Sequence, residues 1–135
     1  MLFKRGNDFN GIAKNVYRYN EITLKGIGGK AGKRLDSYIP GKEIISRKAT
    51  TLSFIKTSTF EGYLNELVTK YPKGSPINAP KFGNEFVGEV LDGAYKLEIP
   101  LSNKVFFESS DVFKKALSDF NLNNDVIVSI KYLAE

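Results

Sequence analysis

Two strand-like runs joined by a tight turn constrain the fold more than any other feature of the sequence. Residues 34–38 and 43–51 read as the arms of a β-hairpin, and Pro40 and Gly41 between them form a strong turn signal. A connection of three residues, ending at Lys42, sets which side chains of the two arms face each other. The chain is therefore expected to contain a sheet with an antiparallel pair in its first half.

Hydrophobic periodicity predicts the elements on either side of this hairpin. Residues 58–71 form the clearest helix, with Ser58 and Glu61 at the spacing of a capping box. The other expected elements are a short helix over residues 8–17, a strand over 21–24, a flexible basic loop over 25–33, a loop over 75–93, a strand over 95–100, a helix over 109–120 and a strand over 125–133. This order predicts an α/β fold in which helices flank a small mixed β-sheet.

The length of 135 residues indicates one domain, because a chain of this size buries roughly 68% of its unfolded surface and can form a full core. No apolar run approaches the ~18 residues that a membrane-spanning helix needs. The first six residues lack the apolar stretch of a signal peptide. We therefore expect residues 1–135 to be a single domain that depends on a carrier if it leaves its cell.

Two missing residue types restrict the chemistry. The sequence contains no Cys, which excludes disulfides, zinc fingers and a thiol nucleophile. It also contains no His, which excludes Ser-His triads and two-histidine ribonuclease mechanisms. Proton transfer near neutral pH must then use a carboxylate or Lys with a shifted pKa, or a metal-bound water.

The net charge of +5 at pH 7 favours binding to polyanions or to an acidic protein. The alternative is a basic surface that serves only solubility. Charge alone does not separate the two interpretations.

Within the hairpin, strand alternation brings an acid, a hydroxyl and an amine to one face. Ser46 and Lys48 share a face, while Arg47 points to the other. If the turn has three residues, Asp36 lies opposite Ser46. Glu43 has the wrong parity to join Lys48, so it is set aside as the acid.

Such a trio suits phosphodiester hydrolysis. A carboxylate can hold a hard divalent cation that keeps open positions for water and a phosphate oxygen. A neighbouring Lys can orient the water or neutralise charge that develops on the phosphorus centre. The alternative is an exposed hairpin whose Asp36–Lys48 pair contributes only ~0–1 kcal/mol to stability.

The same region resembles the nuclease domains of contact-dependent growth inhibition and related polymorphic toxins, which have a type II restriction endonuclease fold. The resemblance covers roughly residues 17–100, and beyond them only the order of elements matches. The matching segments are Tyr19-Asn20-Glu21-Ile22, Arg34-Leu35-Asp36-Ser37-Tyr38, Ile45-Ser46-Arg47-Lys48-Ala49-Thr50, Ser58-Thr59, Tyr63-Leu64-Asn65-Glu66-Leu67, Lys70-Tyr71-Pro72 and Gly93-Ala94-Tyr95-Lys96-Leu97-Glu98-Ile99-Pro100.

This resemblance implies a restriction-endonuclease-like core and four site residues. The family motif, an upstream Glu, an Asp, and a polar residue two positions before a Lys, falls on Glu21, Asp36, Ser46 and Lys48. It implies that Glu21 and Asp36 bind the metal, Ser46 holds a water and Lys48 assists the attacking water. Ser46 replaces the usual acid of wider restriction-enzyme patterns, so one anionic ligand is lost. Oxygen ligands favour Mg²⁺, and relatives of this type also use Zn²⁺.

The basic loop is a candidate phosphate-binding segment. Lys25, Lys30, Lys33 and the following Arg34 combine ammonium and guanidinium groups with glycine-rich backbone, which suits contact with nucleic-acid phosphates. The spacing does not match a nucleotide-binding P-loop. A solvated basic turn is the alternative interpretation.

Together these features predict a metal-dependent endonuclease toxin that cuts nucleic acid, DNA in preference to RNA. The resemblance implies the C-terminal part of a larger effector, secreted or displayed on the cell surface and acting in the cytoplasm of competing bacteria. It also implies a cognate immunity protein, which we expect to be acidic because the toxin is basic. The alternatives are a metal-independent RNase that cuts tRNA and a non-catalytic basic binding or immunity-type module.

Overall fold

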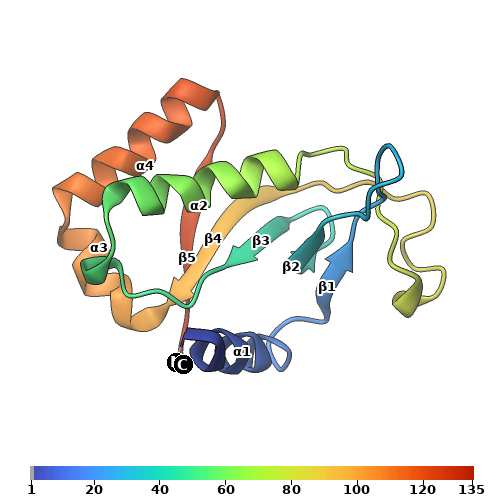
Figure 1. Cartoon of the computed structure of the whole chain (residues 1–135), viewed down its shortest axis with the longest axis horizontal. Coiled ribbons are helices and arrows are strands. Elements are labelled where there is room, and N and C mark those ends of the chain that lie inside the picture. Colours follow the sequence, from blue (N-terminus) through green and yellow to red (C-terminus); the bar gives the residue numbers. More distant parts are fainter. Residues whose placement is uncertain (1) are drawn as a thin grey trace.

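The computed structural model describes the backbone of residues 2–135 and the side chains from residue 4 onward. One mixed sheet contains five strands in the order β1-β2-β3-β4-β5 (Figure 1). Neighbours pair antiparallel from β1 to β3 and parallel from β3 to β5. The strands are β1 Tyr19–Thr23, β2 Arg34–Ile39, β3 Glu43–Arg47, β4 Ala94–Pro100 and β5 Val128–Leu133. The predicted α/β fold with a mixed sheet and flanking helices is confirmed.

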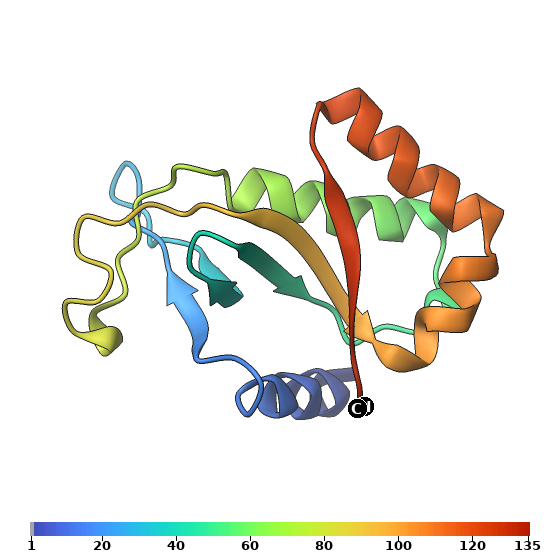
Figure 2. The ribbon, with the colours of Figure 1, turned by 180° about the vertical axis from the view of Figure 1, so that it is seen from behind.

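Helices cover both faces of this sheet (Figures 1 and 2). α2 and α4 pack side by side on one face, and α1 lies against the other. Between Leu2 and Asn124, no helix is long and apolar enough to cross a membrane. The helices are α1 Leu2–Ala13, α2 Thr57–Lys70, α3 Lys104–Ser109 and α4 Asp111–Asn124, and three 3-10 turns are η1 Leu52–Phe54, η2 Pro80–Phe82 and η3 Leu101–Asn103.

The main core lies between the sheet and α2. Phe60, Leu64 and Leu67 recur at helical spacing on α2 and are completely buried. They belong to the same cluster as Leu97 and Ile99 of β4, which are also completely buried. Each such side chain contributes roughly 1.5–3 kcal/mol through burial, so this face fixes how α2 sits on the sheet.

A smaller core forms beneath α1. Ala13, the last residue of α1, and Tyr17, four residues later, pack against Ile45 of β3 on the face of the sheet that α2 does not cover. Arg5 of α1 pairs with Glu135 at 2.9 Å, so the beginning and end of the described chain lie together (Figure 2).

The hairpin has the register that the sequence predicts. Ser37 pairs with Ile45, and the turn closes with a 2.8 Å hydrogen bond from the Lys42 amide to the Ile39 carbonyl. Continuing that register by one position places Asp36 opposite Ser46. This arrangement fixes the acid of β2 beside the end of β3.

Two helix starts differ from the sequence prediction. α1 begins at Leu2 rather than at residue 8 and ends at Ala13, because packing of Phe9 and Ala13 outweighs the low helix propensity of its glycines. α2 begins at Thr57, so Ser58 lies inside the first turn. Its N-cap is Lys56, which makes no side-chain capping bond, and the predicted capping box is therefore wrong.

The C-terminal third also differs in detail. The helix expected over residues 109–120 is α4, which begins at Asp111, and Ser109 is instead the last residue of α3, a helix that the sequence analysis did not predict. Ser110 lies between the two helices, and its hydroxyl accepts a hydrogen bond from the Phe113 amide. This cap turns Val112 outward, where it is 65% exposed, although the sequence pattern placed it inward. Asp125 ends α4 in a left-handed conformation, so β5 starts at Val128 rather than at residue 125.

Candidate active site

Lys48 points toward α2, on the face that the sequence predicts. Its amide donates to the Glu98 carbonyl at 3.0 Å and so extends the pairing of β3 with β4 by one residue. Its Nζ lies 3.1 Å from Oε1 of Glu66 on α2 and 5.3 Å from the centroid of the Tyr63 ring. The side chain is 27% exposed, so the ammonium group is held in place but remains reachable from solvent.

Asp36 is half-buried beside this lysine. Its Oδ2 accepts a 2.7 Å hydrogen bond from the Arg47 amide, which ties the carboxylate to the end of β3. Burial raises the pKa of Asp36, and the negative charge of Glu66 adds to this effect, while Arg47 and Lys48 oppose it. Asp36 and Glu66 are therefore close enough for their negative charges to oppose each other, and a bound cation would relieve this repulsion.

Glu66 is the site residue that the sequence reasoning missed. Burial alone would raise its pKa, but Lys48 and Lys70 together lower it, so the group is held ionised. Lys70 contacts the same Oε1 at 3.2 Å. The available signal was its position three residues after Tyr63, at the border of the apolar face of α2.

Tyr71 follows α2 and closes the same region. Burial, together with the charges of Asp36 and Glu66, raises the pKa of Tyr71 to about 12. Its hydroxyl donates to the Arg34 carbonyl at 2.8 Å. This bond joins the end of α2 to the start of β2, next to the two acids.

Ser46 lies where the sequence predicts, paired with Leu97 in the sheet and opposite Asp36 by register. Only 2% of Ser46 is exposed, so this residue is part of the interior rather than part of the surface.

Glu21 approaches Asp36 from the other neighbouring strand. Pairing between β1 and β2 is interrupted at this point, and Glu21 has a left-handed φ of 56°. Burial alone would raise the pKa of Glu21, but Lys14, Lys81 and Arg34 together lower it. Both acids line one small cavity of about 40 Å³, together with Asn10, Lys14, Asn20, Arg34 and Arg47. Lys48 and Ser46 do not line this cavity, so the structure places Glu21 on the far side of Asp36 from the lysine.

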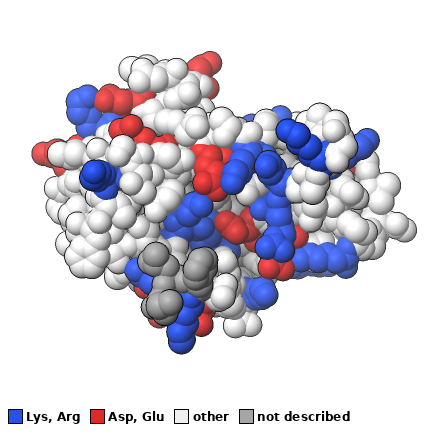
Figure 3. Space-filling model, viewed as in Figure 1, with Lys and Arg blue, Asp and Glu red and all other residues white. Residues whose placement is uncertain are grey.

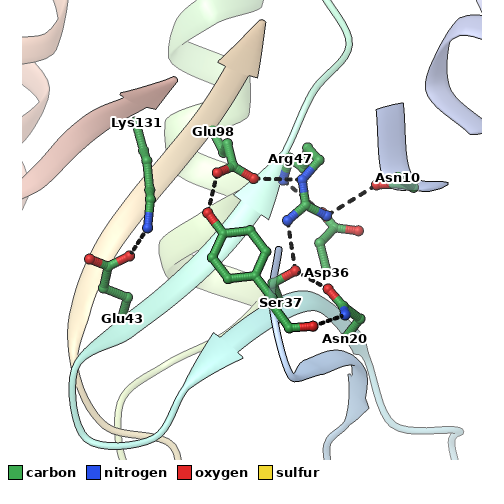
Figure 4. A network of polar contacts seen from close by, with 9 residues as sticks. Asn10, Asn20, Asp36, Ser37, Glu43, Arg47, Glu98 and Lys131 are labelled. Carbon is green, nitrogen blue, oxygen red and sulfur yellow. Dashed lines mark hydrogen bonds and ion pairs between the residues drawn. The ribbon is translucent and has the colours of Figure 1, made fainter. Parts of the chain in front are cut away.

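Arg47 points away from Lys48, as the alternation predicts, and anchors a buried network on the α1 side (Figure 4). Its Nε lies 2.6 Å from Oε1 of Glu98, and these two side chains are 2% and 0% exposed. The other guanidinium nitrogens donate to Ser37 at 2.6 Å and Asn10 at 3.2 Å, and the Tyr17 hydroxyl donates to Glu98. The network holds the Arg47 backbone, and with it the amide that binds Asp36.

Glu43 lies on the α1 side with this network. It pairs with Lys131 of β5, whose Nζ is 5.0 Å from the centroid of the Tyr17 ring (Figure 4). The expectation that Glu43 and Lys48 lie on opposite faces is confirmed.

The basic loop lies against the C-terminal end of α2. Lys25, Lys30 and Lys33 line a cavity of about 530 Å³ together with Lys70. Gly32 is needed for the shape of this loop, because a Cβ there would lie 1.6 Å from the Leu24 carbonyl oxygen. Lys70 also contacts Glu66, so one side chain of the cavity wall pairs with the acid beside Lys48. Figure 3 shows basic and acidic side chains gathered on the face between α2 and α1.

The side chains suit an open metal site better than a closed one. Among the side chains that the structure describes, no three His, Cys, Asp or Glu groups are close enough together to form a metal site. Asp36 and Glu66 supply two carboxylates, and Mg²⁺ in proteins is commonly held by one or two carboxylates with water and substrate phosphate. The donor set therefore fits Mg²⁺, and it does not fit a four-ligand structural zinc site.

Comparison of the chain with protein-family models, with curated proteins and with solved structures found no match.

Proposed function

We propose that this protein is a divalent-metal-dependent nuclease whose active site is formed by Asp36, Lys48 and Glu66. One observation carries the proposal: Lys48 pairs with Glu66 at 3.1 Å, and both charges act on the half-buried Asp36. Lys70, which also contacts Glu66, lines the cavity of the basic loop. Acids that hold a cation, an amine beside them and basic residues along the approach are what phosphodiester hydrolysis requires.

The order of elements supports a restriction-endonuclease-like core for this proposal. One helix, an antiparallel three-strand meander, a second helix and a parallel fourth strand follow each other from α1 to β4. The elements from β1 to β4 lie within residues 17–100, the part of the chain that the resemblance covers. Fold likeness by itself does not establish activity, so the proposal depends on the site.

Each side chain has a definable role in this proposal. Asp36 and Glu66 would hold Mg²⁺, and a bound cation would supply positive charge to the phosphodiester and lower the pKa of the attacking water. Lys48, fixed between Glu66 and Tyr63, contacts the phosphate that is cut or orients the water beside it. Lys70 and the loop lysines bind flanking phosphates, and these contacts do not distinguish one base sequence from another.

Glu21 has a supporting role. Its left-handed backbone and its place in the small cavity, which Asp36 lines and Lys48 does not, make it a second acid near Asp36 rather than a partner of the lysine. Strained non-glycine residues cluster at functional sites, and this strain supports placing the site around Asp36.

The test is digestion of plasmid DNA and total RNA by the purified protein. We expect cutting with Mg²⁺, Mn²⁺ or Zn²⁺ and none in excess chelator, with DNA cut faster than RNA. Cutting that persists in chelator would indicate a metal-independent RNase instead. Intact DNA and RNA under every condition would indicate a non-catalytic basic module.

A Glu66→Gln variant tests the acid that only the structure identifies. Gln keeps an oxygen that can accept from Lys48 but removes the negative charge. We expect cutting to fall roughly tenfold or more and to recover in part at higher Mg²⁺ concentration. Glu61→Gln, an exposed change on the same helix, is the matched control. An unchanged rate and an unchanged Mg²⁺ midpoint for Glu66→Gln would remove Glu66 from the site.

The resemblance also suggests where the activity is used. We propose a toxin domain, part of a larger effector that is secreted or displayed at the cell surface, acting in the cytoplasm of competing bacteria. A net charge of +5 supports an acidic immunity protein as its partner. Pull-down of an acidic protein that is encoded beside the toxin and blocks cutting would test this.

A further inference from the structure

Lys48 lines a further cavity, which no residue of the basic loop lines. Its volume is about 530 Å³, within the range of pockets that hold small ligands. Lys48, Thr51, Phe54, Ile55 and Tyr63 contribute to its wall, and we call these five residues the aromatic pocket. The wall therefore combines an ammonium group with two aromatic rings and one aliphatic side chain.

Phe54 is the notable member of the aromatic pocket. It is 87% exposed, and among the side chains that the structure describes it is the single aromatic one in the set of exposed large hydrophobic residues. Scattered exposed hydrophobic residues are common and by themselves indicate nothing. Phe54 differs because it lines the same cavity as the proposed catalytic lysine.

The turn that carries Phe54 is fixed rather than free. Leu52, at the start of η1, is completely buried, and its amide donates to Oδ1 of Asn103 at 2.8 Å. The amide group of Asn103 in turn donates to the Thr50 carbonyl at 2.9 Å and the Pro100 carbonyl at 3.1 Å. Because the backbone of this turn is already fixed, little further backbone entropy is lost when the Phe54 ring meets a flat partner.

Two arginines also line this cavity, and both are already engaged. Arg47 pairs with the buried Glu98 at 2.6 Å. Arg5 donates to Thr51 at 2.9 Å and to both carboxylate oxygens of Glu135 at 2.9 Å, so it forms a wall rather than a free anion-binding group. Lys48 pairs with Glu66, which does not line this cavity, and contributes an ammonium group that is 27% exposed. The Tyr63 ring lies 5.3 Å from this group, and the Phe54 ring lines the same cavity.

We propose that the aromatic pocket binds an unpaired base next to the phosphate at Lys48, so that the substrate is single-stranded or locally opened nucleic acid. Every base has a π-face that can stack on an aromatic side chain, whereas the bases of an intact duplex stack on one another. This inference rests on the proposed nuclease function and assigns its substrate class. Phe54 is then a substrate-binding residue that does not take part in the chemical step.

The test is fluorescence-anisotropy binding of short DNA in chelator, which prevents cutting. Three probes are compared: a single strand, the same sequence as a duplex, and a strand of equal length whose central nucleotides are abasic. We expect the parent protein to bind the intact strand roughly tenfold more tightly than the abasic strand. Phe54→Ala should abolish this difference and leave binding to the abasic strand unchanged, while Phe54→Tyr keeps the difference.

Leu122→Ala, which changes another exposed hydrophobic residue (81% exposed) on α4, is the matched control and should keep the parent pattern. Equal binding of intact and abasic strands by the parent, or equal loss for all three probes in Phe54→Ala, would overturn the inference. A Phe54→Ala variant that binds nucleic acid like the parent but no longer binds an acidic protein partner would also overturn it.

The substrate class and the nuclease function can fail separately. If the parent cuts nucleic acid but Phe54→Ala changes nothing, the substrate class is wrong and the nuclease function stands. Base-dependent binding without cutting under any metal would refute the nuclease function instead.

Discussion

Replacing Asp36 by Asn or Lys48 by Met is expected to lower the rate of nucleic-acid cutting by roughly a hundredfold or more in each case. Asn keeps an oxygen that can accept the 2.7 Å hydrogen bond from the Arg47 amide, so the hairpin should keep its shape while the charge is lost. Met keeps the apolar stem of Lys48 and removes the ammonium group, and Glu66 retains Lys70 as a partner at 3.2 Å. Initial rates of plasmid digestion at saturating Mg²⁺ measure both effects.

The matched controls for this pair lie on α4. Asp111→Asn and Lys115→Met change the same residue types at exposed positions far from the site, and both should cut at the parent rate. Circular dichroism and thermal unfolding should show all four variants folded. If Asp36→Asn or Lys48→Met stays within about tenfold of the parent, ~1.4 kcal/mol in barrier, the site assignment fails.

Replacing Glu98 by Ala is expected to lower the free energy of unfolding by roughly 3–5 kcal/mol. The change leaves the Arg47 guanidinium in a site where it is 2% exposed, with no carboxylate at its Nε and no acceptor for the Tyr17 hydroxyl. A loss of this size is a large share of the ~5–15 kcal/mol that typically stabilises a folded domain. Urea unfolding, followed by circular dichroism, gives the midpoint and the free energy.

Glu135→Ala provides the comparison, because it breaks an Arg–carboxylate pair of similar geometry whose side chains are 33% and 37% exposed. Solvent screens that pair, so about 0–1 kcal/mol should be lost. A double variant, Arg47→Met with Glu98→Leu, should regain much of the stability lost in Glu98→Ala, because no charge is left buried without a partner. Equal losses for Glu98→Ala and Glu135→Ala would show that the buried network does not stabilise the fold.

The local sequence pattern was enough to predict the part of the site that lies on the neighbouring strands β2 and β3. The side-chain period of two placed Ser46 and Lys48 on one face and Arg47 on the other, and the three-residue turn placed Asp36 opposite Ser46. Both relations depend only on backbone geometry within a single hairpin. The same reasoning correctly set Glu43 apart from Lys48.

Contacts between distant segments were beyond the reach of that reasoning. Glu66 pairs with Lys48 because α2 packs on the sheet through its buried apolar residues Phe60, Leu64 and Leu67. Glu21 departs from regular strand geometry because its own backbone is left-handed, which no periodicity in the sequence signals. The ends of elements were also misjudged where capping and packing compete, as at Ser58 and Val112.

The sequence by itself determined the order of the elements apart from α3, the mixed sheet with its hairpin register, and the absence of histidine and thiol chemistry. These follow from local periodicity, turn residues and composition, which act over a few neighbouring positions. Only the tertiary structure decided that Arg47 and Glu98 form a buried pair, that Glu66 pairs with Lys48, and that Phe54 lines the same cavity as this lysine. Those relations arise when helices pack on the sheet, because burial and charge pairing depend on segments far apart in the chain.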